Sequence, residues 1–176
     1  MEDALLKAQM EFTPVPPDQR HSPARVRSIQ ARLYIDRFVE HAEALEFLSE
    51  VQQRYGEGTK TPVRALLHYQ DTVITPLTKV RAAGRKIPPE LQIAVREFEP
   101  QPNRRSARVK TVSARLRIDL YLEHRQAYEF LQEMQLLHGE GNKTIVRALL
   151  HYRDTVYIPL EKQRAAKRRK NGQGRS

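Results

Sequence analysis

Alternating polar and apolar residues in two short stretches of the chain predict two β-strands. In the first stretch the polar positions are Ser28, Gln30, Arg32, Tyr34 and Asp36, and the apolar positions are Ile29, Ala31, Leu33 and Ile35. The second stretch has Thr111, Ser113, Arg115, Arg117 and Asp119 against Val112, Ala114, Leu116 and Ile118. A lone strand leaves its backbone hydrogen-bonding groups unpaired, so we expect the two strands to pair with each other.

Each predicted strand is followed by a pattern typical of two helices. The first helices cover roughly residues 38–55 and 121–138, with apolar residues at helical spacing, and Gly56 and Gly139 are natural left-handed ends. The second helices are expected to begin near Thr59 and Asn142, which are good N-cap residues. Pro76 and Pro159 are then expected to break or kink them, before a shorter basic helical stretch.

This strand-and-helices pattern is one repeat that occurs twice, 83 positions apart and without a gap. Of the 60 aligned positions from residue 24 to 83, 37 are identical in the second copy. A repeat of this length is usually a structural unit that packs on its twin. Because about 60 residues bury only roughly 60% of their unfolded surface, we expect each copy to depend on the other for stability.

The repeats divide the chain into five predicted segments, with repeat one at 24–83, a linker at 84–106 and repeat two at 107–166. Residues 1–23 contain a short helix-compatible piece and then four prolines, which predicts a flexible N-terminal arm. The linker is long enough for the second repeat to return antiparallel to the first. The tail at 167–176 is basic and is predicted to be disordered.

The formal net charge of +10 is unevenly distributed, and half of it lies in the basic tail. This favours binding to a polyanion, although charge alone does not separate DNA from RNA or from an acidic protein. The absence of cysteine excludes disulfides and thiolate metal sites. No apolar run approaches the ~20 residues needed to span a membrane, and the N-terminus does not read as a signal peptide. We therefore expect a cytoplasmic protein with no membrane partner.

The order of strand, Gly-ended helix and polar-capped helix, used twice, resembles the ribbon-helix-helix superfamily, the class of the Arc and MetJ repressors. Members of that family normally pair two identical subunits through an antiparallel ribbon. The resemblance implies a mostly α fold with a two-stranded antiparallel β-ribbon, formed here by two repeats within one chain as a pseudo-dimer. The stretch from the strand to Gly56 is about one helical turn longer than the family usually has.

A two-stranded ribbon fits the DNA major groove, where each base pair shows a distinct pattern of donors and acceptors. The expected base-contacting residues are Gln30, Arg32, Tyr34, Ser113, Arg115 and Arg117. The second helices are expected to direct their N-termini at phosphates. The expected phosphate-contacting residues are Thr59, Lys60, Thr61, Asn142, Lys143 and Thr144.

The two copies differ within this predicted interface, because Tyr34 corresponds to Arg117 and Gln30 to Ser113. A homodimer reads a palindrome, whereas a fused pair with these differences is free to read an imperfect or asymmetric site. The alternative for the arginines is a solvated strand face that only keeps the ribbon soluble.

Other residues invite a chemical interpretation that the sequence does not support. Asp36 and Asp119 are expected to cap the first helices rather than to meet DNA. His68 and His151 are expected to pack or hydrogen-bond where the repeats meet. Glu40 with His41, and Glu123 with His124, are interpreted as helix-surface pairs, because no nucleophile or phosphate loop accompanies them. We expect no enzymatic activity, no catalytic or metal-ligating residues and no cofactor.

The sequence and its resemblance to this family thus predict a sequence-specific, nucleoid-associated double-stranded DNA-binding protein, and the resemblance implies a transcriptional repressor. Further self-association on DNA stays open. A DNA-processing or partition accessory protein of a plasmid or other mobile element remains an open alternative. So does an antitoxin-like interaction module whose arms fold onto a protein partner.

Overall fold

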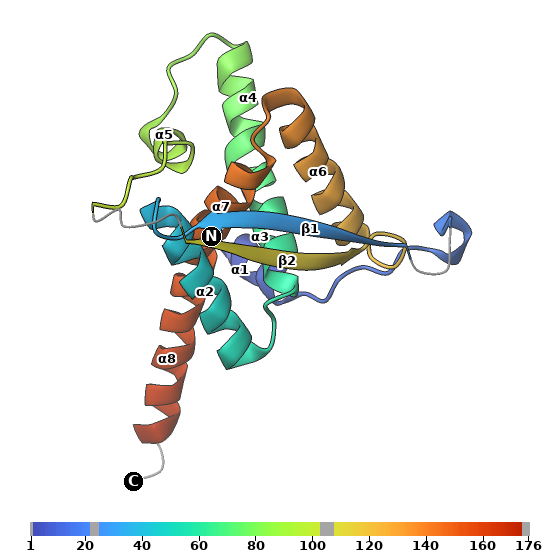
Figure 1. Ribbon diagram of the computed structural model, residues 1–176. Coiled ribbons are helices and arrows are strands. Elements are labelled where there is room, and N and C mark those ends of the chain that lie inside the picture. The colour runs from blue at the N-terminus through green and yellow to red at the C-terminus, as the bar shows by residue number, and fades with distance from the viewer. Residues whose placement is uncertain (1, 22–24, 103–107, 174–176) are drawn as a thin grey trace.

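A computed structural model describes residues 2–21, 25–102 and 108–173 of the chain. The protein is mostly helical and contains one two-stranded antiparallel sheet (Figure 1). The strands cross the front of a helical body, and most helices lie behind them in that view. The prediction of a mostly α chain with a β-ribbon is confirmed at this level.

Strands β1 (Val26–Tyr34) and β2 (Val109–Arg117) form the ribbon, and their side chains alternate as predicted. The inward side chains Ile29, Ala31, Leu33, Ala114 and Leu116 are buried, whereas the polar positions between them face outward. Burial of the apolar face fixes the register of the two strands, because a one-residue slip would turn the apolar side chains of the slipped strand to solvent.

The ribbon register is centred on Gln30, which lies directly opposite Ser113. These two residues occupy the same position in the two sequence copies. Arg32 therefore faces Thr111 on one side of the central pair, and Ser28 faces Arg115 on the other. Corresponding residues of the two copies thus lie on opposite strands, the same number of residues from the central pair.

Helices α2 (Val39–Tyr55) and α6 (Leu122–His138) follow the strands and end at glycines, as the sequence predicts. Gly56 and Gly139 have φ of 65° and 63°, a left-handed conformation that glycine adopts without a Cβ penalty. In the turn after α2, the side-chain oxygen of Gln52 accepts a hydrogen bond from the backbone N–H of Gly58 at 2.8 Å. A Cβ at position 58 would lie 2.6 Å from that oxygen, so a larger residue there would displace the Gln52 side chain and break this hydrogen bond.

The second helices are longer than predicted because the prolines do not break them. Helix α3 (Lys60–Tyr69) continues through the π-helical segment η2 (Gln70–Ile74) into α4 (Thr75–Ala82). In the other copy, α7 (Gly141–Tyr152) continues through η3 (Arg153–Tyr157) into α8 (Ile158–Gln173). The wider π-helical turn accommodates each proline, which lacks an N–H and would clash with the carbonyl four residues earlier.

The core lies between the ribbon and the pair formed by α3 and α7, which pack against each other behind it. Its fully buried side chains come from both copies and include Leu33, Val63, Leu66, Leu116, Val146 and Leu149. Each such side chain contributes about 1.5–3 kcal/mol by leaving water. The two copies therefore contribute to one core.

Two straps, defined as residues 2–16 and 89–102, tie the copies together. Each strap has a short helix, α1 (Glu2–Gln9) or α5 (Pro89–Ala94), followed by the pattern Glu-Phe-x-Pro-x-Pro. Strap 1 lies along repeat two, where the backbone N–H of Val15 donates to the carbonyl of Leu120 at 2.8 Å. Strap 2 lies along repeat one, where Gln101 donates to Arg37 at 3.0 Å.

The straps correct the expectation of a flexible arm and a plain linker. Leu5 and Val15 of strap 1 are buried, and a single turn of 3-10 helix, η1 (Pro17–Gln19), follows it. The prolines prevent a regular helix or sheet, but they do not prevent an extended segment from bonding to a neighbouring helix. Residues 1, 22 and 23 of the predicted arm and 103–106 of the linker lie outside the described part of the chain, as do the first residues of the two repeats, 24 and 107.

The basic tail also differs from the prediction, because α8 is helical through residue 173. In repeat one, Gly84 follows α4 with φ of 61° and the helix ends. Lys167 occupies the corresponding position in repeat two, and there the helix continues. Residues 174–176 of the predicted tail are not among the described residues. Within the described residues, no helix is long and apolar enough to cross a membrane.

Candidate nucleic-acid interface

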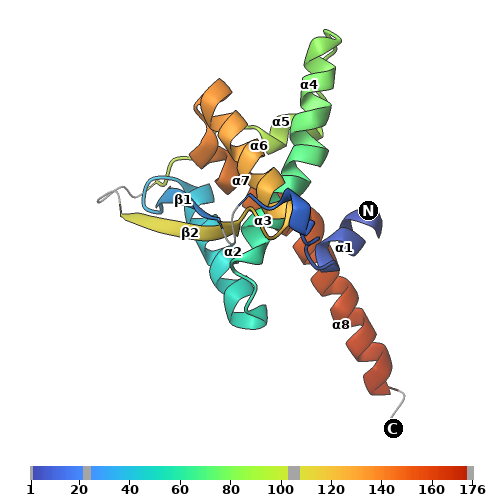
Figure 2. The same cartoon turned by 90° about the vertical axis from the view of Figure 1, so that its right-hand side faces the viewer.

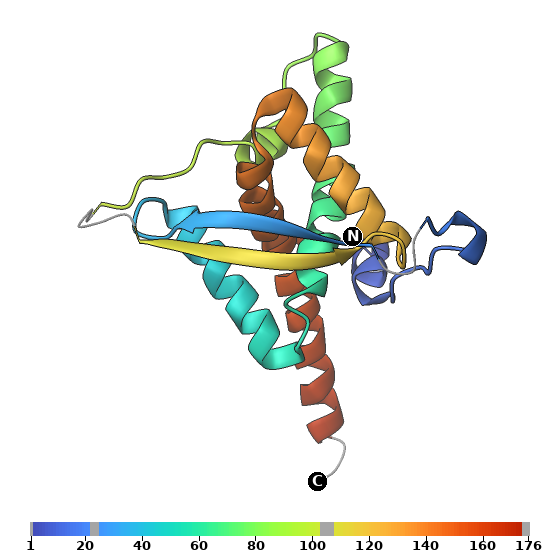
Figure 3. The ribbon, with the colours of Figure 1, turned by 45° about the vertical axis from the view of Figure 1, so that its right-hand side comes forward.

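The outer face of the ribbon carries all six residues that were expected to contact bases. Gln30, Arg32, Ser113, Arg115 and Arg117 are exposed, and Tyr34 is half-buried. The ribbon lies in front of the helices in both Figure 1 and Figure 3, so the described helices leave this outer face open. The strand alternation thus brings these side chains together on one accessible surface.

The outer face is positive, and its arginines are free to bind a ligand. Among the described residues, Arg32, Arg115 and Arg117 form no ion pair with a carboxylate. The carboxylates nearest to them in sequence, Asp36 and Asp119, bond to backbone instead. Asp36 accepts from the N–H of Arg108 at 3.2 Å, and Asp119 is 3% exposed.

The same bond forms at the other end of the ribbon, where Asp119 accepts from the N–H of Arg25 at 3.2 Å. Asp119 also lies 3.8 Å from the guanidinium of Arg125 on α6. The prediction that Asp36 and Asp119 cap the first helices is wrong, because the N-cap residues are Phe38 and Tyr121. Each aspartate holds the start of the opposite strand.

Two buried histidines anchor the ends of the outer face. Nδ1 of His41 accepts the N–H of Tyr34 at 2.9 Å, and Nδ1 of His124 accepts the N–H of Arg117 at 3.0 Å. Because Nδ1 accepts, each ring is neutral with its proton on Nε2. Burial lowers the pKa of both histidines, which favours that neutral form.

The interpretation of these histidines and their neighbouring glutamates as surface pairs is therefore wrong. Glu40 is 5% exposed, and its carboxylate accepts the N–H of Glu99 in strap 2 at 2.8 Å. Glu123 does the same for strap 1, accepting the N–H and the hydroxyl of Thr13, both at 2.7 Å. The only sequence signal for this role was that Glu-His recurs in both copies.

Asn142, expected to contact phosphate, is bonded to the ribbon instead. Its side-chain oxygen accepts the N–H of Arg32 at 2.8 Å, and its side-chain nitrogen donates to the carbonyl of Arg32 at 2.9 Å. Asn142 is also inside α7 rather than its N-cap, because α7 begins at Gly141. The corresponding Thr59 is exposed and makes no capping bond through its side chain.

Thr61 and Thr144, also expected to contact phosphate, are turned into the protein. They are 4% and 1% exposed. Their hydroxyls donate to the carbonyls of Glu57 and Glu140 at 2.9 and 2.8 Å. A buried hydroxyl satisfied in this way cannot reach a phosphate without unfolding the first turn of its helix, so these two assignments need correction.

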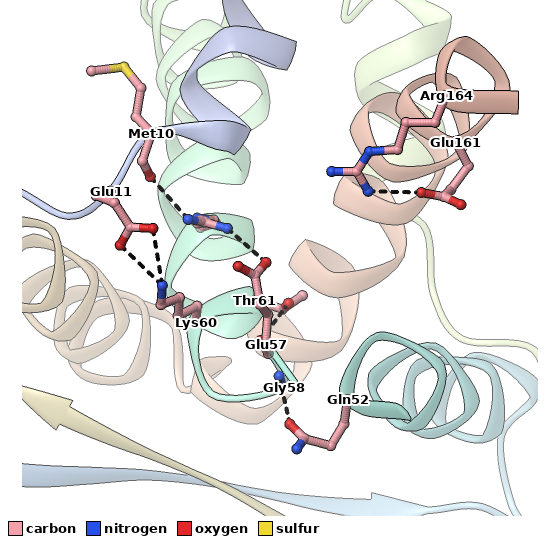
Figure 4. A network of polar contacts seen from close by, with 10 residues as sticks. Met10, Glu11, Gln52, Glu57, Gly58, Lys60, Thr61, Glu161 and Arg164 are labelled. Carbon is pink, nitrogen blue, oxygen red and sulfur yellow. Dashed lines mark hydrogen bonds and ion pairs between the residues drawn. The ribbon is translucent and has the colours of Figure 1, made fainter. Parts of the chain in front are cut away.

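Lys60 and Lys143 remain accessible at the starts of the second helices, and each meets a strap glutamate. Lys60 Nζ lies 3.1 Å from Glu11 (Figure 4). Lys143 Nζ lies 3.1 Å from Glu97. Lys143 lowers the pKa of Glu97, which keeps that carboxyl charged. Both glutamates are about four-fifths exposed, so these ion pairs are weak and open to exchange with another anion.

The neighbouring arginines are more firmly held. Arg64 lies 3.2 Å from Glu57 and donates to the carbonyl of Met10 in strap 1 at 3.0 Å. Arg147 forms the same contacts with Glu140 and with the carbonyl of Arg96 in strap 2. These arginines fasten the straps to the second helices, and we assign them no direct part in the outer face.

His68 and His151 stack where α3 and α7 meet, with ring centroids 5.2 Å apart. Nε2 of His68 lies 2.9 Å from the hydroxyl of Thr155, and Nε2 of His151 lies 3.0 Å from that of Thr72. The threonine hydroxyls donate to backbone carbonyls, so the histidines must donate to them. The expectation that these histidines hydrogen-bond where the repeats meet agrees with these contacts.

Comparison of the chain with known protein families, with curated proteins and with solved structures gave no match. The function is therefore argued below from the geometry and charge of this chain.

Proposed function

We propose that this chain is a sequence-specific double-stranded DNA-binding protein that inserts its β-ribbon into the major groove. The observation that carries the proposal is the outer face of the ribbon. That face presents Gln30, Ser113 and three exposed arginines that have no ion pair within the described chain.

We further propose that the two repeats pair as ribbon-helix-helix units within one chain. Support comes from the register, because the central pair Gln30 and Ser113 joins corresponding positions of the two copies. It also comes from contacts that occur in matched pairs, such as His41 with Tyr34 and His124 with Arg117. An arrangement of this kind presents two similar halves to a duplex.

The chemistry of the face suits base recognition. An arginine can donate two parallel hydrogen bonds to guanine O6 and N7, and a glutamine can pair with adenine N6 and N7. Each such contact discriminates against a wrong base by about 1–3 kcal/mol. Arg32 and Arg115 correspond to each other in the two copies, so we expect them to contact equivalent base pairs in the two half-sites.

Phosphate contacts would position the ribbon without reading sequence. Lys60 and Lys143 are the best candidates of the expected set, because their glutamate partners are exposed and exchangeable. Thr59 is exposed near Lys60 and can assist it. Asn142, Thr61 and Thr144 are omitted, since their side chains are already engaged.

A protein that occupies a defined site on chromosomal DNA blocks polymerase where that site overlaps a promoter, so we propose a transcriptional repressor associated with the nucleoid. The described straps bind this chain's own helices rather than projecting as free arms. The observations therefore favour DNA binding over the antitoxin-like alternative.

Selection of bound duplexes from a random DNA pool at near-physiological salt tests the proposal. We expect the wild type to enrich a motif, and the variant Arg32→Ala/Arg115→Ala/Arg117→Ala to lose it. A matched control, Lys79→Ala/Arg81→Ala/Arg85→Ala, removes three exposed cations near α4 and should retain the motif. Failure of the wild type to enrich any motif would contradict the proposal.

A further inference from the structure

Helix α8 carries a concentrated positive charge that the ribbon does not use. Between residues 158 and 171 the chain has six cations and one carboxylate. The carboxylate, Glu161, is already engaged by Tyr55 and Arg164. Lys162, Lys167, Arg168, Arg169 and Lys170 are exposed and form no ion pair within the described residues.

The position of α8 keeps this charge away from the ribbon. In Figure 2 the ribbon lies on one side of the body, and α8 leaves the body on the other side and points away from it. Its 16 residues correspond to a helix about 24 Å long. A duplex bound to the outer face of the ribbon would therefore leave the far end of α8 free.

The residue types on α8 indicate what kind of partner it fits. Lys167, Arg168, Arg169 and Lys170 are consecutive, so at about 100° per residue they surround the helix rather than forming one face. Beyond Leu160 the described part of α8 has no large apolar residue that could anchor a protein interface or enter a membrane surface. Cations without an apolar anchor fit a nucleic-acid backbone, which they bind by releasing its counterions.

We propose that α8 is a second, sequence-independent nucleic-acid-binding element, which lets one molecule hold a second duplex while the ribbon occupies its own site. Binding of the first duplex by the ribbon rests on the proposed function. Binding of the second duplex by α8 does not depend on it, because the α8 cations need no defined sequence.

A bridging assay tests this proposal. A biotinylated duplex carrying the selected motif is immobilised and saturated with protein, unbound protein is washed away, and a fluorescent duplex of unrelated sequence is added. We expect the wild type to retain the fluorescent duplex and to release it as salt rises. The variant Lys167→Gln/Arg168→Gln/Arg169→Gln/Lys170→Gln should still occupy the immobilised motif but retain at least ten-fold less fluorescent duplex.

A matched variant, Lys79→Gln/Arg81→Gln/Arg85→Gln/Lys86→Gln, removes the same number of exposed cations from the end of α4 and should still bridge. Undiminished bridging by the α8 variant, or an equal loss from both variants, would overturn the assignment to α8. If the wild type selects no motif, the ribbon variant Arg32→Ala/Arg115→Ala/Arg117→Ala separates motif binding by the ribbon from sequence-independent binding by α8. This variant should still bind the unrelated duplex, and the binding should fall when the four α8 cations are also replaced. Unchanged binding after that replacement would overturn the inference about α8, whatever the ribbon does.

Discussion

The carboxamide of Asn142 holds the backbone of Arg32 through both of its polar groups, at 2.8 and 2.9 Å. These bonds join the start of α7 to the free edge of β1. The corresponding pair in the other copy is Thr59 and Arg115, and Thr59 makes no such bond. The two halves of the ribbon are therefore supported differently, although their outer arginines correspond.

Replacing Asn142 by threonine, the residue of the other copy, should lower the free energy of unfolding by about 1 kcal/mol, because two exposed hydrogen bonds are lost. Urea denaturation measures the change. The reciprocal variant Thr59→Asn should add a smaller stabilisation by holding Arg115. Equal stability of Asn142→Thr and the wild type would show that the carboxamide does not support the edge.

The symmetry of the DNA site should follow from Gln30 and Tyr34, the outer-face residues that differ most from their counterparts. We expect the wild type to select a motif with two unequal halves. The variant Gln30→Ser/Tyr34→Arg copies the repeat-two residues into repeat one and should select a motif closer to a perfect inverted repeat. A wild-type motif that is already a perfect inverted repeat would contradict this reading.

Glu11 and Glu97 should compete with DNA for Lys60 and Lys143. Exposed ion pairs are worth about 0–1 kcal/mol each, so Glu11→Gln/Glu97→Gln should raise DNA affinity about two- to five-fold at low salt. Fluorescence anisotropy at several salt concentrations would measure it, and the gain should shrink as salt rises. The control Glu46→Gln/Glu129→Gln removes two exposed carboxylates at corresponding positions on α2 and α6. It should change affinity less, and an equal gain from both variants would indicate a general effect of net charge.

Phe12 and Phe98 should contribute strongly to the hold of the straps. The ring centroid of Phe12 lies 4.7 Å from that of His124 and 5.4 Å from the guanidinium carbon of Arg64. The ring centroid of Phe98 likewise lies 4.9 Å from that of His41 and 5.4 Å from the guanidinium carbon of Arg147. Since both rings are half-buried, Phe12→Ala or Phe98→Ala should cost about 2–3 kcal/mol, less than the loss of a fully buried phenylalanine.

Thermal and urea unfolding would measure that cost, and leucine at either position should recover much of it by restoring apolar contact. Proteolysis within residues 2–16 should also become faster in Phe12→Ala. Unchanged stability in both alanine variants would mean that the straps are held by their backbone bonds alone.

Stability should fall as the pH is lowered from about 7. Burial, together with the neighbouring charges of His151 and Lys7, lowers the pKa of His68 to about 4, and burial also lowers the pKa of His151. The unfolded chain takes up these protons near pH 6.5, before the folded chain does. For His68 this window extends from about 6.5 to about 4, and within it the unfolded chain binds more protons and is favoured. Stability from this source is fully present above that window and is lost on descending through it.

Urea unfolding at pH 7.5, 6.0 and 5.0 would measure this dependence. His68→Gln/His151→Gln removes both titrating groups while keeping a donor for Thr72 and Thr155, so its stability should depend less on pH. A variant with the same pH dependence as the wild type would assign the effect to other groups, among which His41 and His124 come first.

The local sequence pattern determined the strands and the helix ends, which depend on the conformational preferences of neighbouring residues. Strict alternation from Ser28 and from Thr111 predicted both strands and the outward set of side chains, because side chains on a strand alternate between its faces. Gly56 and Gly139 marked the ends of α2 and α6, since only glycine adopts their left-handed conformation at low cost.

Tertiary structure decided which polar side chains remain available for a ligand. Asn142 and Asp36 are polar residues at suitable sequence positions, but each is bonded to a distant backbone group that sequence alone could not place. The straps were missed for the same reason, because prolines rule out a helix or a sheet interior but not an extended segment bonded across the chain. Such bonds join residues up to 110 positions apart, so only the folded arrangement of the two copies reveals them.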